Sequence, residues 1–179
     1  MSDTLAERLF ARARKPRPVA GGTYLFHRGD PVRSLYLVCA GSVELVRHQE
    51  NGASVILQRA GAGAILAEAS AYSDTYHCDG VAVAPSEIRE LTVPAFHRIL
   101  GADRDLADGW AAYLAREVQA SRYRGEILSK KTVAERLDGW LVWHDRGLPP
   151  KGAWKEVAGE IGVTPEALYR EIARRRRGS

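Results

Sequence analysis

Short apolar runs separated by turn residues fill the chain between positions 21 and 100. The runs rich in β-branched and aromatic residues are 23–26, 34–38, 42–46, 55–57, 81–83 and 88–91. Strands of this length, recurring about every 8 to 12 residues with glycine, proline and aspartate between them, are typical of an all-β barrel or sandwich. Residues 49–52 contain an Asn-Gly pair, which tolerates the positive φ of a tight hairpin turn, and 55–57 would be the return strand.

The pattern changes to a helical period after residue 104. Apolar residues recur every three to four positions, at Leu106, Trp110, Leu114, Val118 and, after the polar Ser121, Leu128. This spacing predicts one long amphipathic helix. Charged residues flank its seam, so Trp110, Leu114, Val118 and Ser121 are candidates for contact with a partner helix. Packing of the same face on its own domain is the alternative.

A capping box begins another helix, and two more helical segments follow it. Thr132 and Glu135 have the spacing at which side chain and backbone cap each other, so they predict a helix start. Farther on, Gly162 can adopt the left-handed conformation that ends a short helix, Thr164 can cap the next one, and Pro165 suits its first position. The sequence therefore predicts a helix-turn-helix.

The second helix of this motif offers groups that read DNA. Leu168 and Ile172 would face inward, and the outward residues are Thr164, Glu166, Ala167, Arg170 and Arg174. A carboxylate can accept from cytosine N4, and a guanidinium can donate to guanine O6 and N7. The arginine run 174–177, Arg175 included, would neutralise phosphates and make binding salt-dependent. A plain helical hairpin with a solvated charged tail is the alternative.

Composition and charge limit the classes of protein to which the chain can belong. The chain has 179 residues, 45% hydrophobic and 27% charged, which is ordinary for one globular domain or two small ones. No apolar run approaches the ~20 residues that cross a bilayer, and the two cysteines form no disulfide framework, so we expect a cytoplasmic protein without a membrane partner. The net charge of +4 permits a polyanionic partner without requiring one.

In this order the segments resemble the cyclic AMP receptor protein / FNR (Crp-Fnr) family of transcription regulators. Residues 29–43 look like the β-roll signature of the family, 63–68 like the start of its phosphate-binding cassette, and 155–170 like its helix-turn-helix. The resemblance implies an α+β fold: an N-terminal double-stranded β-roll (a cyclic-nucleotide-binding-like jelly roll), a long dimerisation helix and a C-terminal helix-turn-helix. It also implies a homodimer that binds a near-palindromic operator on double-stranded DNA, with RNA polymerase as a candidate partner.

Boundaries follow from these segments. We expect a helical arm over 1–20, the β-roll sensor over 21–103, the dimerisation helix over 104–130 and the DNA-binding domain over 131–179. Only residues 174–179 follow the recognition helix, where family members continue into a β-hairpin, so we expect most of this wing to be lacking.

The expected effector pocket departs from the family. Glu68, which by resemblance would hold a ribose, is kept, but Cys78 and Asp79 stand where an Arg-Ser or Arg-Thr pair would hold a cyclic phosphate. A thiol and a carboxylate remove the counter-charge and add a repulsive one, which argues against cyclic AMP as effector. His77 and Cys78 could instead bind a transition metal or haem iron, although a structural histidine and an inert thiol are favoured. Two cysteines are too few for an iron-sulfur cluster of the FNR type.

No enzyme motif is present in the sequence. There is no GxSxG, HExxH, Walker loop or CxxC, and the partial fingerprint at Gly61 and Gly63 has Leu66 where a third glycine is needed. We therefore expect a transcription regulator and not an enzyme. The alternative is an effector-binding or scaffolding module whose vestigial helix-turn-helix does not bind DNA specifically.

Overall fold

The computed structural model describes residues 4–49, 54–145 and 147–178. Its elements, in chain order, are α1 (Leu5–Phe10), β1 (Arg17–Val19), β2 (Tyr24–Phe26), β3 (Ser34–Ala40), β4 (Val43–His48), β5 (Ser54–Ala60), β6 (Ile65–Leu66), the 3-10 helix η1 (Glu68–Ser70), β7 (Asp79–Ala82), β8 (Ser86–Thr92), α2 (Val93–Ala102), α3 (Arg104–Ser129), α4 (Val133–His144), the 3-10 helix η2 (Lys151–Ala153), α5 (Trp154–Glu160) and α6 (Pro165–Gly178). They fall into two compact units, Met1–Ala112 and Tyr113–Ser179, whose boundary lies within α3.

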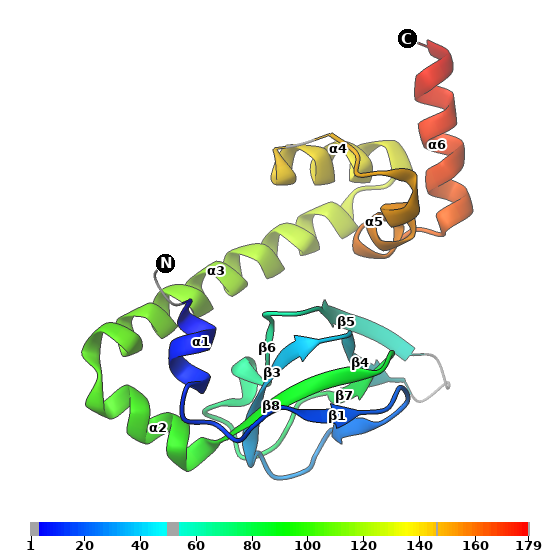
Figure 1. Ribbon diagram of the computed structural model, residues 1–179. Coiled ribbons are helices and arrows are strands. Elements are labelled where there is room, and N and C mark those ends of the chain that lie inside the picture. Colours follow the sequence, from blue (N-terminus) through cyan, green and yellow to red (C-terminus); the bar gives the residue numbers. More distant parts are fainter. Residues whose placement is uncertain (1–3, 50–53, 146, 179) are drawn as a thin grey trace. The chain divides into compact units, whose positions relative to one another are not determined.

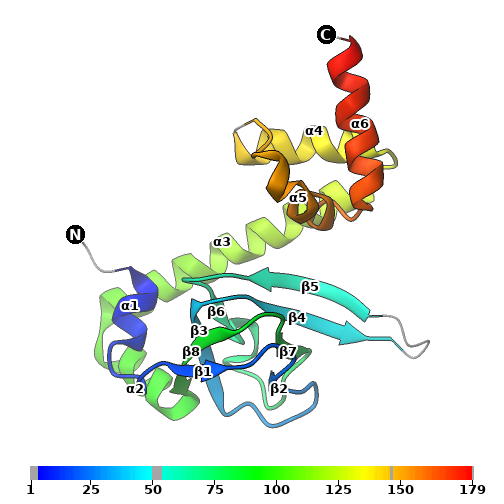
Figure 2. The same ribbon diagram turned by 45° about the vertical axis from the view of Figure 1, so that its right-hand side comes forward.

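The N-terminal unit is built on two four-stranded antiparallel sheets (Figure 1). One sheet has the order β1-β8-β3-β6 and the other β2-β7-β4-β5. The apolar residues of the predicted strands supply a buried core, which includes Phe26, Val38, Leu45 and Ile88. This arrangement confirms the predicted jelly-roll-like fold. Figure 2 shows β4 and β5 running side by side, and the two strands are paired antiparallel, as expected for a hairpin. Its predicted turn residues 50–52 lie outside the described part of the chain.

The roll begins earlier than the expected boundary at residue 21. Arg17, in the segment assigned to a helical arm, opens β1 and pairs with Ile88 of β8. This pairing joins segments about 70 residues apart, so the local pattern could not reveal it. Strand β6 and helix α2 were not predicted either, because β6 has only two residues and α2 begins directly where β8 ends.

Trp110 corrects the predicted seam of the long helix. Its side chain is only 3% exposed and its ring packs edge-on against Phe96 of α2, with ring centroids 4.9 Å apart. Trp110 therefore belongs to the core of the N-terminal unit and not to an exposed face. Farther along α3, Leu114 is half-buried, whereas Val118 and Ser121 are exposed. The exposed seam thus starts after Trp110.

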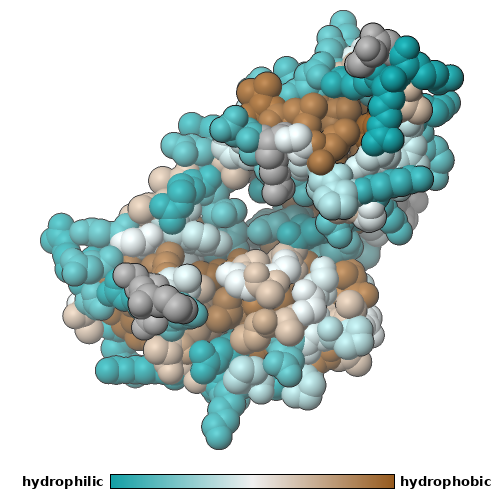
Figure 3. All heavy atoms as spheres, turned by 45° about the horizontal axis from the view of Figure 1, so that its top comes forward, coloured by the Kyte–Doolittle hydropathy of each residue, from teal (hydrophilic) through white to brown (hydrophobic). Residues whose placement is uncertain are grey.

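The C-terminal unit consists of packed helices with a common apolar core. The capping box is present: Thr132 Oγ1 accepts from the Glu135 N–H at 3.2 Å, and Glu135 Oε2 accepts from the Thr132 N–H at 3.0 Å. The buried residues of the core are Ile127, Leu137, Trp140, Trp154, Val157, Ala158, Ile161, Leu168 and Ile172. Figure 3 shows that hydrophobic surface remains on this unit, where Val142 of α4 is 76% exposed.

Candidate nucleic-acid interface and sensor pocket

The turn between α5 and α6 is built as the sequence predicts. Gly162 has φ +65°, a left-handed conformation that glycine adopts without steric cost. The Val163 N–H donates to the Ala158 carbonyl at 2.9 Å, and Thr164 Oγ1 accepts from the Ala167 N–H at 3.2 Å. After this turn α6 starts in a new direction, as in a helix-turn-helix.

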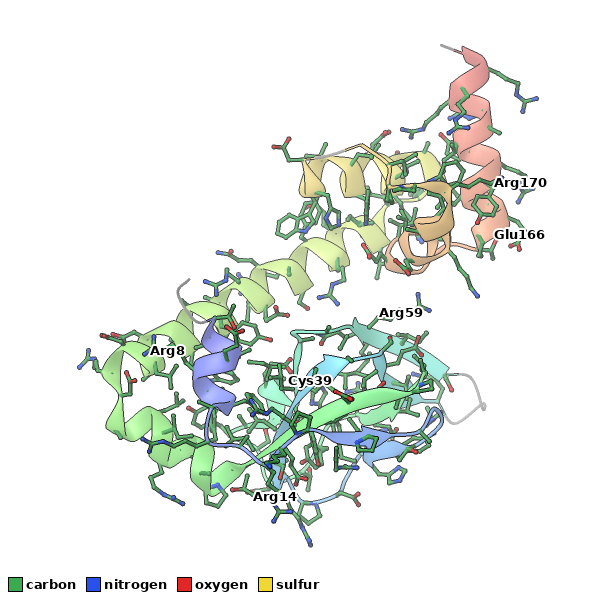
Figure 4. All side chains as sticks on the ribbon, in the orientation of Figure 1. Arg8, Arg14, Cys39, Arg59, Glu166 and Arg170 are labelled. Atoms are coloured by element: carbon green, nitrogen blue, oxygen red, sulfur yellow. The ribbon has the colours of Figure 1, made fainter. Side chains whose placement is uncertain are left out.

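The inner face of α6 packs in the core of the C-terminal unit, and its outer face is exposed. Leu168 is fully buried and Ile172 nearly so, whereas Glu166 and Arg170 are exposed one turn apart. Figure 4 shows both of these side chains extending from the same side of α6. Of the other predicted residues, Thr164 is exposed and Ala167 is half-buried. The outer face therefore carries one carboxylate and one guanidinium within reach of a single ligand surface.

Part of the arginine run is paired within the unit. Glu171 is 8% exposed, and its carboxylate accepts from Arg174 Nε and Nη2, both at 2.9 Å, and from Arg175 Nε at 2.8 Å. Arg175 also donates to Asp138 Oδ1 at 2.6 Å and to the Ala134 carbonyl at 3.0 Å.

These contacts distinguish Arg174 from Arg175, although the sequence predicts DNA contacts for both. The side chain of Arg175 is 32% exposed and ties α6 to α4, while that of Arg174 is 69% exposed. Hydrogen bonds from Arg174 and Arg175 hold the pKa of Glu171 down at about 2. The negative charge of Glu171 is therefore permanent at neutral pH.

In the sensor unit, Cys78 lies inside the β-roll. It is 2% exposed, and burial, with a further contribution from the negative charge of Glu68, raises the pKa of its thiol to about 11. Glu68 opens η1 directly after Ala67, which has φ +65°. Glu68 therefore lies close enough to Cys78 for its charge to act on the thiol.

His77 differs from Cys78 in its surroundings. Its side chain remains partly accessible and Nδ1 lies 3.0 Å from Ser70 Oγ. Partial burial and the charge of Arg47 lower the pKa of His77, which favours the neutral imidazole. A buried thiol and an accessible imidazole that follow each other along the chain do not converge on one point. Within residues 4–49, 54–145 and 147–178, no cluster of three or more His, Cys, Asp or Glu side chains is arranged to hold a metal ion.

Asp79 contacts residues at the ends of two neighbouring strands. Its Oδ1 accepts from the Arg28 N–H at 3.1 Å and lies 3.2 Å from His27 Nδ1, and its Oδ2 lies 3.9 Å from His48 Nε2. The carboxylate is thus contacted by the two residues that follow β2 and by the last residue of β4, and these two strands flank β7 in the sheet.

Sequence reasoning missed Arg47 at this site. Arg47 Nη2 donates to the His77 carbonyl at 3.0 Å, and its positive charge acts on both His77 and Cys78. Its place follows from the pairing of β4 with β7, in which Val46 stands opposite Asp79. The only local indication in the sequence is a basic residue near the end of an apolar strand. It does not show which strand pairs with β4.

Comparisons with known proteins agree with this architecture. Residues 16–103 match the family model of the cyclic nucleotide-binding domain. The fumarate and nitrate reduction regulatory protein of Vibrio cholerae is 23% identical over 170 residues, which are 89% of this chain and 68% of that protein. The cAMP-activated global transcriptional regulator CRP of Pasteurella multocida is 24% identical over 157 residues, or 82% and 75% of the two chains.

A solved structure extends the likeness to the fold of nearly the whole chain. The c-di-GMP responsive global regulator CLP of Xanthomonas campestris superposes with a TM-score of 0.67 at 20% identity, over 97% of this chain and 91% of that one. Fold and site thus define a regulator class in which a cyclic nucleotide-binding β-roll is combined with a helix-turn-helix unit. Residues 16–103 belong to the cyclic nucleotide-binding domain family, and the chain is similar in sequence and fold to transcription regulators of the Crp-Fnr type.

No helix in the described residues is both long enough and apolar enough to cross a bilayer.

Proposed function

We propose that this chain is a dimeric, sequence-specific DNA-binding regulator whose sensor pocket does not accept cyclic AMP in the usual mode. The observation that carries the proposal is the outer face of α6, where Glu166 and Arg170 are exposed on a helix fixed from below by Leu168 and Ile172. In a helix-turn-helix the early outward residues of the second helix meet base edges. We assign base contacts to Glu166 and Arg170, and backbone or flanking contacts to Thr164, Ala167 and Arg174.

Dimerisation is proposed along the C-terminal part of α3. Leu114, Val118 and Ser121 lie on one face of the helix, and Val118 is 48% exposed in the single chain. Burial of apolar side chains at this spacing against a second copy would stabilise a parallel helix pair. Such a pair would place two recognition helices about 34 Å apart, the length of one DNA turn.

The chemistry around position 78 argues against a cyclic phosphate at its usual place. Relatives named as responsive to cAMP or c-di-GMP share the fold, but here Asp79 places a carboxylate, and Cys78 an uncharged thiol, at the positions that match the phosphate contacts. A phosphate there would meet repulsion and no bidentate partner. Arg47 of β4, whose charge acts on the Cys78 thiol, is a candidate for a cationic contact with an effector.

The test is selection from random duplex DNA at two salt concentrations, with Arg170→Ala as variant and Arg98→Ala, an exposed arginine of α2, as control. We expect enrichment of a two-fold symmetric sequence, a loss of about 1 to 3 kcal/mol in Arg170→Ala with relaxed preference at one base pair, and no change in the control. Equal binding of Arg170→Ala and the parent protein to all sequences would favour a vestigial motif in a scaffolding module. Calorimetric titration with cyclic AMP should give no heat of binding.

A further inference from the structure

The guanidinium of Arg136 collects backbone carbonyls from three places in the C-terminal unit. From the first turn of α4, its Nη2 donates to Leu128 and its Nε to Lys130, at 3.0 and 2.9 Å. Its Nη1 donates to Ile161 and Gly162, at 3.2 and 3.0 Å. One side chain thus satisfies carbonyls at the end of α3 and just after α5, where helix ends leave acceptors without intrahelical partners.

The same junction is closed by an apolar contact. A Cβ added at Gly162 would lie 2.5 Å from Leu128 Cδ2, so the turn of the helix-turn-helix rests directly on the last turn of α3. Ile127, the preceding residue, is buried in the core that also contains Ile161 and Leu168. The turn is therefore fixed to α3 from two sides, by packing and by the guanidinium.

We infer that Arg136 is a positioning residue that locks the helix-turn-helix to the end of α3 and so sets the separation of the two recognition helices in the dimer. The inference rests on the proposed function, because it concerns the dimer and its DNA. A planar fork with five donors can bond carbonyls in several directions, whereas an ammonium on a flexible stem cannot span them. Arg136→Lys therefore keeps the charge and loses the lock, and Arg136→Met loses both.

The first measurement does not depend on DNA. Spin labels are placed on exposed positions of the same unit, Gln119→Cys in α3 and Ala173→Cys in α6, in a Cys39→Ser background, and labelled chains are diluted with unlabelled ones. The distances between the two spin labels, measured by pulsed electron-electron double resonance, should form a narrow distribution in the parent protein. The distribution should be distinctly wider in Arg136→Lys and Arg136→Met. Equal widths would overturn the inference. If Arg136→Met does not fold, Arg136→Lys alone decides.

The second measurement uses operators whose half-sites are moved one base pair apart or together, beside a duplex with a single half-site. We expect the preference for the native spacing to fall about tenfold in both variants, while single half-site affinity stays within about twofold, because the reading face of α6 is untouched. Equal losses on the half-site and on every spacing would mean a merely structural role and would overturn the inference. Failure of the parent to select any DNA would refute the proposed function, and the spin-label distances would still decide the role of Arg136.

Discussion

Replacing Glu171 by glutamine tests the ionic cluster that holds α6 against α4. The substitution removes the charge that accepts three hydrogen bonds from Arg174 and Arg175, at 2.8 to 2.9 Å. Hydrogen bonds to charged groups contribute about 1.5 to 3 kcal/mol each when buried. Arg174 regains water because it is largely exposed, and Arg175 keeps Asp138 and the Ala134 carbonyl. We therefore expect the free energy of unfolding of the C-terminal unit to fall by about 2 kcal/mol in total at pH 7.

The pKa of Glu171 determines how the stability difference between the parent protein and Glu171→Gln changes with pH. The pKa of Glu171 is lowered from an ordinary value of 4.5 to about 2 in the folded protein. A carboxyl of this kind contributes its full stabilisation above the unfolded pKa, and the contribution is lost as pH falls through the folded one. The stability difference between parent and Glu171→Gln should therefore be constant from pH 7 to about 5 and shrink toward zero as the pH approaches 2.

Urea unfolding followed by tryptophan fluorescence is a suitable assay, because three of the four tryptophans, at positions 140, 143 and 154, lie in the C-terminal unit. Glu166→Gln, an exposed glutamate on the same helix, is the matched control and should change stability by less than about 0.5 kcal/mol. Equal stability of parent and Glu171→Gln at pH 7, or a difference that persists unchanged at pH 2.5, would refute the ionic role of Glu171.

Three further predictions address other parts of the chain. Leu114→Glu should convert a dimer to a monomer in sedimentation experiments, and an unchanged mass would remove α3 as the interface. Gly162→Ala should destabilise the C-terminal unit in thermal melts by about 2 kcal/mol or more, since φ +65° is unfavourable for alanine and its Cβ would meet Leu128; a melting temperature equal to the parent's would contradict this. Cys78, with its pKa raised to about 11, should resist alkylation at pH 8 in the native protein while Cys39, which is partly exposed, reacts; equal rates by mass spectrometry would show that Cys78 is not protected.

The parts that the sequence predicts well are those fixed by neighbouring residues. The capping box at Thr132 and the turn at Gly162 and Thr164 depend on contacts within a few positions, and both are present in the structure. The helical period after residue 104 locates α3 to within two residues at its start. Contacts between residues a few positions apart can be predicted directly from the sequence.

The parts that the sequence does not predict depend on partners far along the chain. Arg47 reaches the sensor site because β4 and β7 pair across more than 30 positions. Trp110 has the spacing of a dimer seam, yet Phe96 from another helix covers it. Arg174 and Arg175 are alike in sequence, and the contacts of Arg175 with Asp138 and the Ala134 carbonyl of α4 distinguish them. In each case the deciding contact comes from an element whose place cannot be read from local periodicity.

The ion cluster on α6 also changes how strongly salt should weaken DNA binding. Four consecutive arginines suggest four released counterions per chain, but the charge of Arg175 is balanced inside the protein by Glu171 and Asp138. Since log affinity falls against log salt with a slope of roughly 0.9 for each neutralised phosphate, the run should contribute a slope of about 2.7 per chain instead of about 3.6. More of the DNA affinity must then come from contacts that ions in solution do not displace, and such a regulator would hold its site with less sensitivity to ionic strength than its basic terminus suggests.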